Sequence, residues 1–179
     1  IRGYGCVPSF LNYNGYPAAI GVSVNYEVVH GIPSPHRFIR EGDIVSLDAG
    51  VIYKGYHSDA ARTYGIGHIS EEAQRLIDVT RECFFEGIKY AKEGNHLFDI
   101  SSAIGRYAGE RGYGVVRDLC GHGNGTNLHE SPEIPNYEQG RKGVLLKEGM
   151  TLAIAPMINI GTWEVEWLAD DWTVVTKAH

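Results

Sequence analysis

Two strand-forming segments, residues 44–51 and 56–64, flank the tetrapeptide Tyr53-Lys54-Gly55-Tyr56. The first segment is rich in β-branched residues, and Lys54-Gly55 fits the two-residue turn of a β-hairpin. Such a turn pairs residue 48 with residue 61 and places Asp48 diagonally opposite Asp59. Both carboxylates then lie on one face with their Cα atoms roughly 7 to 8 Å apart, close enough to share one cation. We therefore expect a hairpin that presents two acids to one cleft.

A glycine-rich segment supplies a third candidate ligand. His122 lies between two glycines, which allow the backbone to bend sharply or to be approached closely by a ligand or another strand. Two carboxylates in one cleft repel each other unless a cation or a proton lies between them. We therefore predict a metal site formed by Asp48, Asp59 and His122. The alternative is structural, with Asp59 paired to Arg62 and Asp48 capping a turn.

The rest of the pattern predicts an α+β fold. The order β-β-α-α-β-β favours a mostly antiparallel sheet with helices packed on one face. The 179 residues, 43% of them hydrophobic, are enough for a single domain over residues 1–179. We expect strands at 19–25 and near Val28, helices from the Ser70 cap to Gly94 and over 98–112, and final strands at 150–159 and 164–177.

A weak internal repeat relates two parts of the chain. Residues 41–49 align with residues 148–156, and both segments enter a predicted strand through Glu-Gly. Two similar halves would face one cleft, and in this register Ala155 matches Asp48. The pseudo-symmetry therefore predicts a carboxylate at position 155, where the chain has alanine. Chance agreement between two Glu-Gly strand entries is the alternative.

Composition excludes some classes of partner. A net charge of −6 gives no general attraction to nucleic acid or to anionic lipid. No apolar run approaches the roughly 20 residues of a membrane span, so we expect neither nucleic acid nor membrane as a partner. Cys6, Cys83 and Cys120 are odd in number and lack Cys-x-x-Cys spacing, which favours reduced thiols in the cytoplasm. Cys120 beside His122 is either a nucleophile or a buried structural thiol.

Seven short motifs agree in order with one known family. They are Tyr13–Pro17, Val29–Pro33, Ser46–Gly50, Ser58–Thr63, Gly121–Gly123, Leu128–Glu130 and Asp171–Val174. On these motifs the chain resembles the bacterial, type I methionine aminopeptidases, which are metallopeptidases of the pita-bread fold. The resemblance covers essentially the whole chain. It implies hydrolytic removal of N-terminal methionine from peptides and nascent proteins.

The resemblance also implies a metal centre. Asp48 and Asp59 match two metal-binding aspartates of the family, with Asp59 the bridging one, and His122 matches its metal-binding histidine. The implied cofactors are divalent cations of cobalt, manganese, iron or zinc, two of them in the family. A metal-bound hydroxide would attack the scissile carbonyl.

Further matches imply the substrate groove. His129 resembles the catalytic histidine that contacts the scissile carbonyl, and His30 a second catalytic, substrate-facing histidine. Tyr13, Tyr16 and Trp172 match the aromatic residues of the pocket for the substrate methionine, which His30 adjoins.

The chain departs from the family at several positions. Ala155 replaces a ligand glutamate of the family. The family's last ligand glutamate lies on a further strand after the Trp172 segment, which this sequence does not include. The resemblance therefore implies a fold incomplete at both termini. Two carboxylates compensate two divalent cations poorly, so we expect at most one cation and impaired activity. Gly21, Asn124 and Asn127 depart as well, which indicates a remodelled or engineered site. The alternative is a non-catalytic pita-bread module that binds peptides, or a remodelled scaffold.

Overall fold

The computed structural model describes residues 1–177. Its helices are α1 (Glu71–Ile88) and α2 (Leu97–Gly109), with short 3-10 helices at Arg2–Tyr4 and Tyr13–Gly15. Its strands are β1 (Val7–Pro8), β2 (Gly21–Val24), β3 (Glu27–Val29), β4 (Ile44–Tyr53), β5 (Tyr56–Gly65), β6 (Tyr113–Val115), β7 (Gly121–Gly123), β8 (Glu130–Ile134), β9 (Leu152–Ala153), β10 (Ile158–Ile160), β11 (Val165–Trp167) and β12 (Val174–Thr176).

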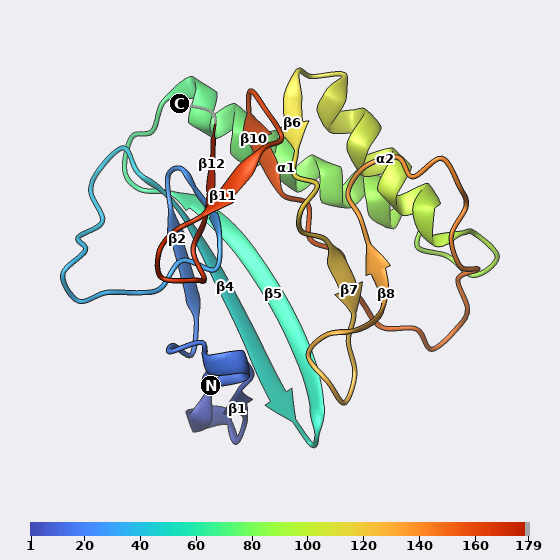
Figure 1. Ribbon diagram of the computed structural model, residues 1–179, viewed down its shortest axis with the longest axis horizontal. Helices are drawn as coiled ribbons and strands as arrows, with labels where there is room; N and C mark the ends of the chain where they lie inside the picture. Colours follow the sequence, from blue (N-terminus) through green and yellow to red (C-terminus); the bar gives the residue numbers. More distant parts are fainter. Residues whose placement is uncertain (178–179) are drawn as a thin grey trace.

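The long β4–β5 hairpin runs through the middle of the molecule (Figure 1). Its turn has positive φ angles at both Lys54 (50°) and Gly55 (83°), as a two-residue hairpin turn of matching twist requires. The pairing Tyr53 with Tyr56 extends back to Asp48 with Ala61, which is the predicted register. β1 and β2 pair with the other edge of β4.

The second half contributes smaller sheets. β7 lies between β8 and β9, β10 pairs with β6, and β12 lies between β11 and β3. The β3–β12 pairing joins the N-terminal part of the chain to its C-terminal part. Every strand pair in residues 1–177 is antiparallel, which confirms the predicted sheet type.

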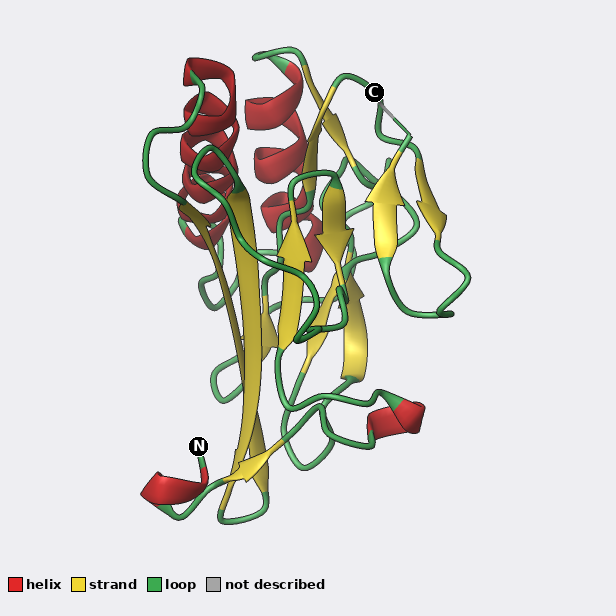
Figure 2. Ribbon diagram, turned by 90° about the vertical axis from the view of Figure 1, so that its left-hand side faces the viewer, coloured by secondary structure: helices red, strands yellow, loops and turns green. Residues whose placement is uncertain are grey.

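Both helices pack side by side on one side of the strands, as predicted (Figures 1 and 2). α1 begins after its Ser70 cap, whose hydroxyl accepts a hydrogen bond from the Ala73 amide. The helices approach closely at Gly87, where a Cβ would lie 2.9 Å from Ile104. The core between helices and strands consists mainly of Cys83, Leu97, Ile100, Ile104, Ala108, Ile134, Leu146 and Ile158.

Several predicted boundaries were wrong. α1 ends at Ile88 instead of continuing to Gly94, because residues 90 and 91 turn back onto the carbonyls of Gly87 and Ile88. The strand expected over 150–159 divides into β9 and β10, and that over 164–177 divides into β11 and β12. β9 and β10 are separated where the Ala155 carbonyl accepts a hydrogen bond from the Asn136 side chain instead of from a neighbouring strand. Strands β1, β6, β7 and β8 were not predicted.

Candidate metal centre and substrate groove

The β4–β5 register brings Asp48 and Asp59 together. Asp59 pairs with Gly50 and Asp48 with Ala61, so the two carboxyls project from one face. They lie within hydrogen-bonding reach of each other. Burial and the neighbouring Asp59 charge raise the pKa of Asp48 to about 8. Burial also acts to raise the pKa of Asp59, but hydrogen bonds from His122 and Asp48 outweigh it and hold that pKa below its usual value. Near neutral pH the pair therefore shares one proton.

His122 reaches the same place from β7. Its Nε2 lies 3.5 Å from Asp59 Oδ2, and both side chains are 14% exposed. Its Nδ1 lies 2.9 Å from the Gly123 carbonyl, which only accepts, so Nδ1 carries a proton. Burial acts to lower the pKa of His122, but the bond to Asp59 and that carbonyl raise it overall. A neutral His122 therefore turns the lone pair of Nε2 toward Asp59.

The glycines beside His122 are required by neighbouring strands. A Cβ on Gly121 would lie 2.3 Å from the Ala153 carbonyl, and one on Gly123 would lie 2.4 Å from the Ser131 carbonyl. Neither glycine has a positive φ. Close approach of backbone, and not a sharp bend, is therefore what the Gly-His-Gly sequence provides.

The donor set fits a single divalent cation. Asp48 Oδ1 is buried and has no hydrogen-bond partner, which is costly for a carboxyl oxygen unless a cation reaches it. Carboxylate oxygens and an imidazole nitrogen are suitable ligands for manganese, iron, cobalt or zinc. Within residues 1–177, however, no three His, Cys, Asp or Glu side chains are already arranged as a metal site. A cation would have to displace the proton between the aspartates.

Residue 155 lies close to the His122 strand. β9 pairs with β7 through Ala153 and His122, and Ala155 follows two residues later, with its amide nitrogen 3.3 Å from where a Cβ on Gly121 would lie. The fully buried Asn136 donates to the Ala155 carbonyl at 2.7 Å and fixes the backbone there. The methyl group of Ala155 supplies no ligand.

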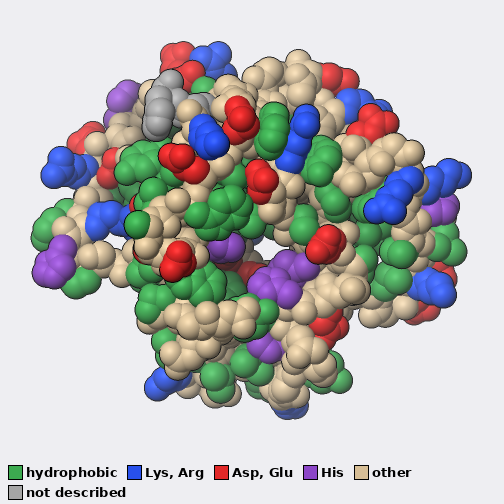
Figure 3. Space-filling view, viewed as in Figure 1, with side chains coloured by type: hydrophobic (Ala, Val, Ile, Leu, Met, Phe, Trp, Pro, Cys, Tyr) green, Lys and Arg blue, Asp and Glu red, His purple; other side chains and the backbone are tan. Residues whose placement is uncertain are grey.

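The two histidines of the predicted groove are both exposed. The rings of His129 and His122 are 4.3 Å apart, and His129 Nδ1 is hydrogen-bonded to the Tyr13 hydroxyl at 2.7 Å. Burial and the neighbouring His122 lower the pKa of His129. His30 is exposed overall, but the loss of solvent around its ring lowers its pKa. Histidine side chains gather around a central hollow of this face (Figure 3).

The aromatic residues form one wall. The ring of Trp172 lies 5.0 Å from that of Tyr16 and 6.4 Å from that of His30, edge to face in both cases. The buried Tyr16 also donates its hydroxyl to the Gly31 carbonyl at 2.9 Å, so it supports the loop that carries His30. Burial and the charge of Asp48 raise the pKa of Tyr16 to about 12, so this donor stays protonated.

The structural alternatives for the acids and for Cys120 gain no support. The ion pair of Asp59 in the described chain is with His122, and none joins it to Arg62. Burial raises the pKa of Cys120, which disfavours the thiolate that a nucleophile needs.

Three contributors to the site were missed in the sequence. Asp170 accepts hydrogen bonds from the amides of Trp172 and Thr173 and from the Thr173 hydroxyl, and so holds the turn that presents Trp172. The Asp-x-x-Thr spacing of residues 170–173, which is typical of a polar turn, is the sequence pattern that could have identified Asp170. Asn136, and the pair of Glu27 and Arg37, had no comparable local signal.

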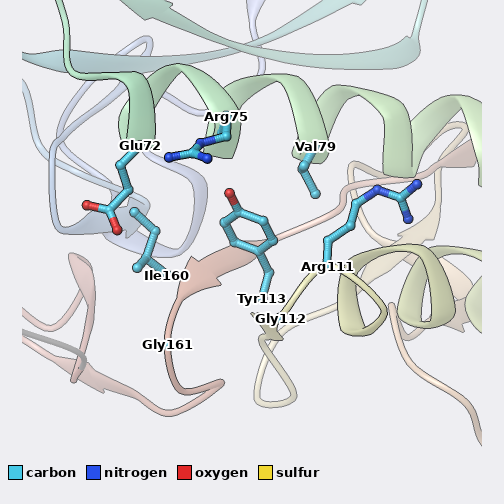
Figure 4. A pocket seen from close by; sticks show the side chains of 8 residues that line it. All are labelled: Glu72, Arg75, Val79, Arg111, Gly112, Tyr113, Ile160 and Gly161. Atoms are coloured by element: carbon cyan, nitrogen blue, oxygen red, sulfur yellow. The ribbon is translucent and has the colours of Figure 1, made fainter.

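Two further surface hollows lie elsewhere. One of about 500 Å³ adjoins both helices and the β10 end, and is lined by Glu72, Arg75, Val79, Arg111, Gly112, Tyr113, Ile160 and Gly161 (Figure 4). It contains no histidine and is separate from the metal centre.

Neither α1 nor α2 has the length and apolarity of a membrane-crossing helix, a finding that covers residues 1–177.

Comparison with known sequences places these motifs in one family. The chain is 54% identical over 177 residues to a methionine aminopeptidase of Clostridium acetobutylicum, covering 99% of this chain and 71% of the relative. It is 49% identical over 176 residues to methionine aminopeptidase 1 of Bacillus subtilis, covering 98% of this chain and 71% of that protein.

Solved structures agree. The crystal structure of a methionine aminopeptidase from Thermotoga maritima superposes with a TM-score of 0.96 at 46% identity, over 99% of this chain and 71% of that one. A prolidase from Pyrococcus furiosus gives a TM-score of 0.68 at 29% identity, over 87% and 43%. These relatives confirm the pita-bread architecture. The model of metallopeptidase family M24 matches residues 2–176, and the chain belongs to this family.

Proposed function

We propose that this chain is a metal-dependent aminopeptidase that releases N-terminal methionine from peptides and nascent proteins, at a reduced rate. The observation that carries the proposal is the convergence of Asp48, Asp59 and His122 beside two groove histidines and an aromatic wall. The names of the related proteins support the same substrate.

Asp48, Asp59 and His122 would hold the cation. When bound, a divalent cation supplies Lewis acidity and lowers the pKa of water. Two carboxylates balance one such cation, and Ala155 offers no further charge, so we propose at most one cation per chain. Cobalt, manganese, iron and zinc all suit this mixed oxygen and nitrogen donor set.

We assign the remaining histidines to the substrate. We assign the Tyr13 hydroxyl as the donor to Nδ1 of His129, which leaves the ring proton on Nε2 as a hydrogen-bond donor for substrate. That proton would stabilise negative charge developing on the scissile carbonyl oxygen. His30 would contact the substrate from the opposite rim, beside Trp172.

The aromatic wall suits a methionine side chain. Thioether sulfur packs favourably against aromatic rings, and Tyr16 and Trp172 offer an edge-to-face pair at 5.0 Å. Tyr13, bonded to His129, would complete this part of the groove.

A second candidate function is peptide binding without catalysis. The proton shared by Asp48 and Asp59, together with alanine at position 155, favours it, because a pair that keeps its proton needs no metal. The three cysteines are free thiols, in keeping with a reducing cytoplasm, and the net charge of −6 favours neither nucleic acid nor anionic membrane as a partner.

Hydrolysis of the peptide Met-Ala-Ser with manganese or cobalt present, followed by chromatography, tests the proposal. We expect slow release of methionine that Asp59→Asn abolishes and that Asp78→Asn, a change on the surface of α1, leaves intact. Saturable binding of the peptide without any cleavage would favour the second candidate.

A further inference from the structure

A partly buried ion pair holds the loop that follows β3. Arg37 Nη1 donates to both carboxylate oxygens of Glu27, at 2.6 and 2.7 Å. The side chains are only 30% and 11% exposed. A partly buried, charge-assisted pair is stronger and more rigid than a fully exposed ion pair.

The same pair also binds backbone on both sides of the loop. Arg37 Nη2 donates to the carbonyls of Val22 at 2.7 Å and Ile32 at 3.4 Å. Glu27 Oε2 accepts from the amide of Val24 at 2.9 Å. One ion pair therefore ties β2, β3 and the loop after β3 together. We call Glu27 and Arg37 the loop clamp.

The residue that the loop clamp encloses is strained. His30 has a φ of 60°, in the left-handed region that residues other than glycine rarely adopt. The next residue has no room for a side chain, since a Cβ on Gly31 would lie 2.2 Å from the Val22 carbonyl and 2.8 Å from Glu27 Oε2. The backbone at His30 is therefore fixed by what surrounds it.

Further hydrogen bonds converge on Gly31. Its carbonyl accepts from the amide of Val22 at 2.8 Å and from the Tyr16 hydroxyl at 2.9 Å, and its amide donates to the Ser23 hydroxyl at 3.1 Å. Among residues 1–177, the hydrogen bond recorded at the next carbonyl, that of Ile32, comes from Arg37. Removing the guanidinium would free the far side of the loop.

The opposite side of the groove is attached to the same strand and has one further support of its own. Val174 and Val175 of β12 pair with Val29 and Glu27 of β3, and Asp170 holds the turn before β12. Glu27 therefore lies on a strand that β12 contacts, while Arg37 bonds to the His30 side, so the 6.4 Å distance between the Trp172 and His30 rings depends on where the loop lies.

We propose that Arg37, with Glu27, is a positioning residue that fixes His30 opposite Trp172 and so sets the width of the groove for the methionine side chain. The inference rests on the proposed function only in its last step, where His30 and Trp172 contact substrate. Neither Glu27 nor Arg37 touches substrate in this account.

Amide and histidine NMR resonances, with L-methionine as the probe ligand, test this proposal. Arg37→Lys keeps the charge, but one ammonium cannot bond Glu27 and two carbonyls in a fixed fork. Glu27→Gln removes the charge and keeps the size. Arg40→Met, at an exposed arginine in the same loop without a side-chain partner among the described ion pairs, is the matched control.

We expect the resonances of His30 and Gly31 to shift in Arg37→Lys and Glu27→Gln, and the dissociation constant for L-methionine to rise about tenfold. The affinity for L-alanine, which does not reach the aromatic wall, should change less, and a merely structural role would not alter this ratio. Arg40→Met should match the parent chain in all three readouts.

Unchanged His30 and Gly31 resonances in both clamp variants would overturn the proposal. So would shifted resonances with an unchanged ratio of methionine to alanine affinity, in a parent chain that binds methionine. If the parent chain does not bind methionine, the proposed contact of His30 and Trp172 with substrate is overturned together with the proposed function. The resonances of His30 and Gly31 then still decide whether the loop clamp positions His30. Glu27→Gln keeps the test decisive should Arg37→Lys fail to fold.

Discussion

Asp48 and Asp59 project from paired strands onto one face and share a proton, because burial and the charge of Asp59 raise the pKa of Asp48 to about 8. Asp48 Oδ1 meanwhile has no partner. Near neutral pH the metal-free pair therefore carries one proton, which a bound cation must replace, and this relationship determines how the protein responds to pH and metal.

Stability of the metal-free protein should fall as pH rises from about 4 to 8. The folded pKa of Asp48 is raised, so its contribution to stability is present below the unfolded value near 3.8 and is lost as pH passes through the folded value of about 8. Urea unfolding in EDTA at several pH values measures this. Asp48→Asn should flatten the slope, and an equal slope in that variant would contradict the assignment.

Metal binding should release protons and strengthen with pH. A cation must replace the proton between Asp48 and Asp59, so affinity should rise until pH passes the pKa of about 8. Calorimetric titration with manganese in buffers of different ionisation enthalpy counts the protons released. More than one per cation is expected near pH 6.5, because the cation displaces the proton of the aspartate pair and also the proton that the raised pKa of His122 keeps on the imidazole. Release of none would show that the pair is already ionised.

Ala155→Glu should raise metal affinity by about tenfold or more, because an added carboxylate supplies both charge and a ligand beside His122. Ala155→Gln is the matched control, similar in size and without charge. Equal affinities in the two variants would show that position 155 does not face the cation.

Tyr13→Phe should lower the rate of methionine release about tenfold and leave metal affinity unchanged. The change removes the 2.7 Å hydrogen bond that fixes the ring and tautomer of His129. Steady-state kinetics and metal titration separate the two effects. Parent-like turnover in this variant would show that the Tyr13 hydroxyl does not contribute to methionine release.

Asn136→Ala should destabilise the protein by about 1 to 3 kcal/mol, because it leaves the partly buried Ala155 carbonyl without its donor. Thermal unfolding checks this, with Asn136→Leu as a variant of similar size that lacks the amide donor. Destabilisation by Ala but not by Leu would point to packing as the cause.

The features that were predictable from sequence are local. Lys54-Gly55 fixes the hairpin turn, and the turn fixes the register that brings Asp48 to Asp59. Ser70 marks the start of α1 in the same local way. The two histidines and the aromatic residues came instead from the family resemblance, and their roles in binding and catalysis stay predictions.

What was missed depends on distant contacts. β7 is a glycine-histidine-glycine segment with no strand-forming side chains, and it exists because β8 and β9 pair with it. The bond from Asn136 to Ala155 joins residues 19 positions apart, and the loop clamp depends on the path of a whole loop. No periodicity in the sequence encodes such contacts.

We propose that Asp48, Asp59 and His122 form a centre for a single cation that supports slow release of methionine. Metal analysis of the protein after equilibration with manganese or cobalt, paired with Met-Ala-Ser hydrolysis by the same sample, tests it most directly. We predict about one cation per chain, with slow methionine release that rises with metal occupancy. Two fully occupied cations with rapid turnover, or methionine release that persists without any bound metal, would contradict it.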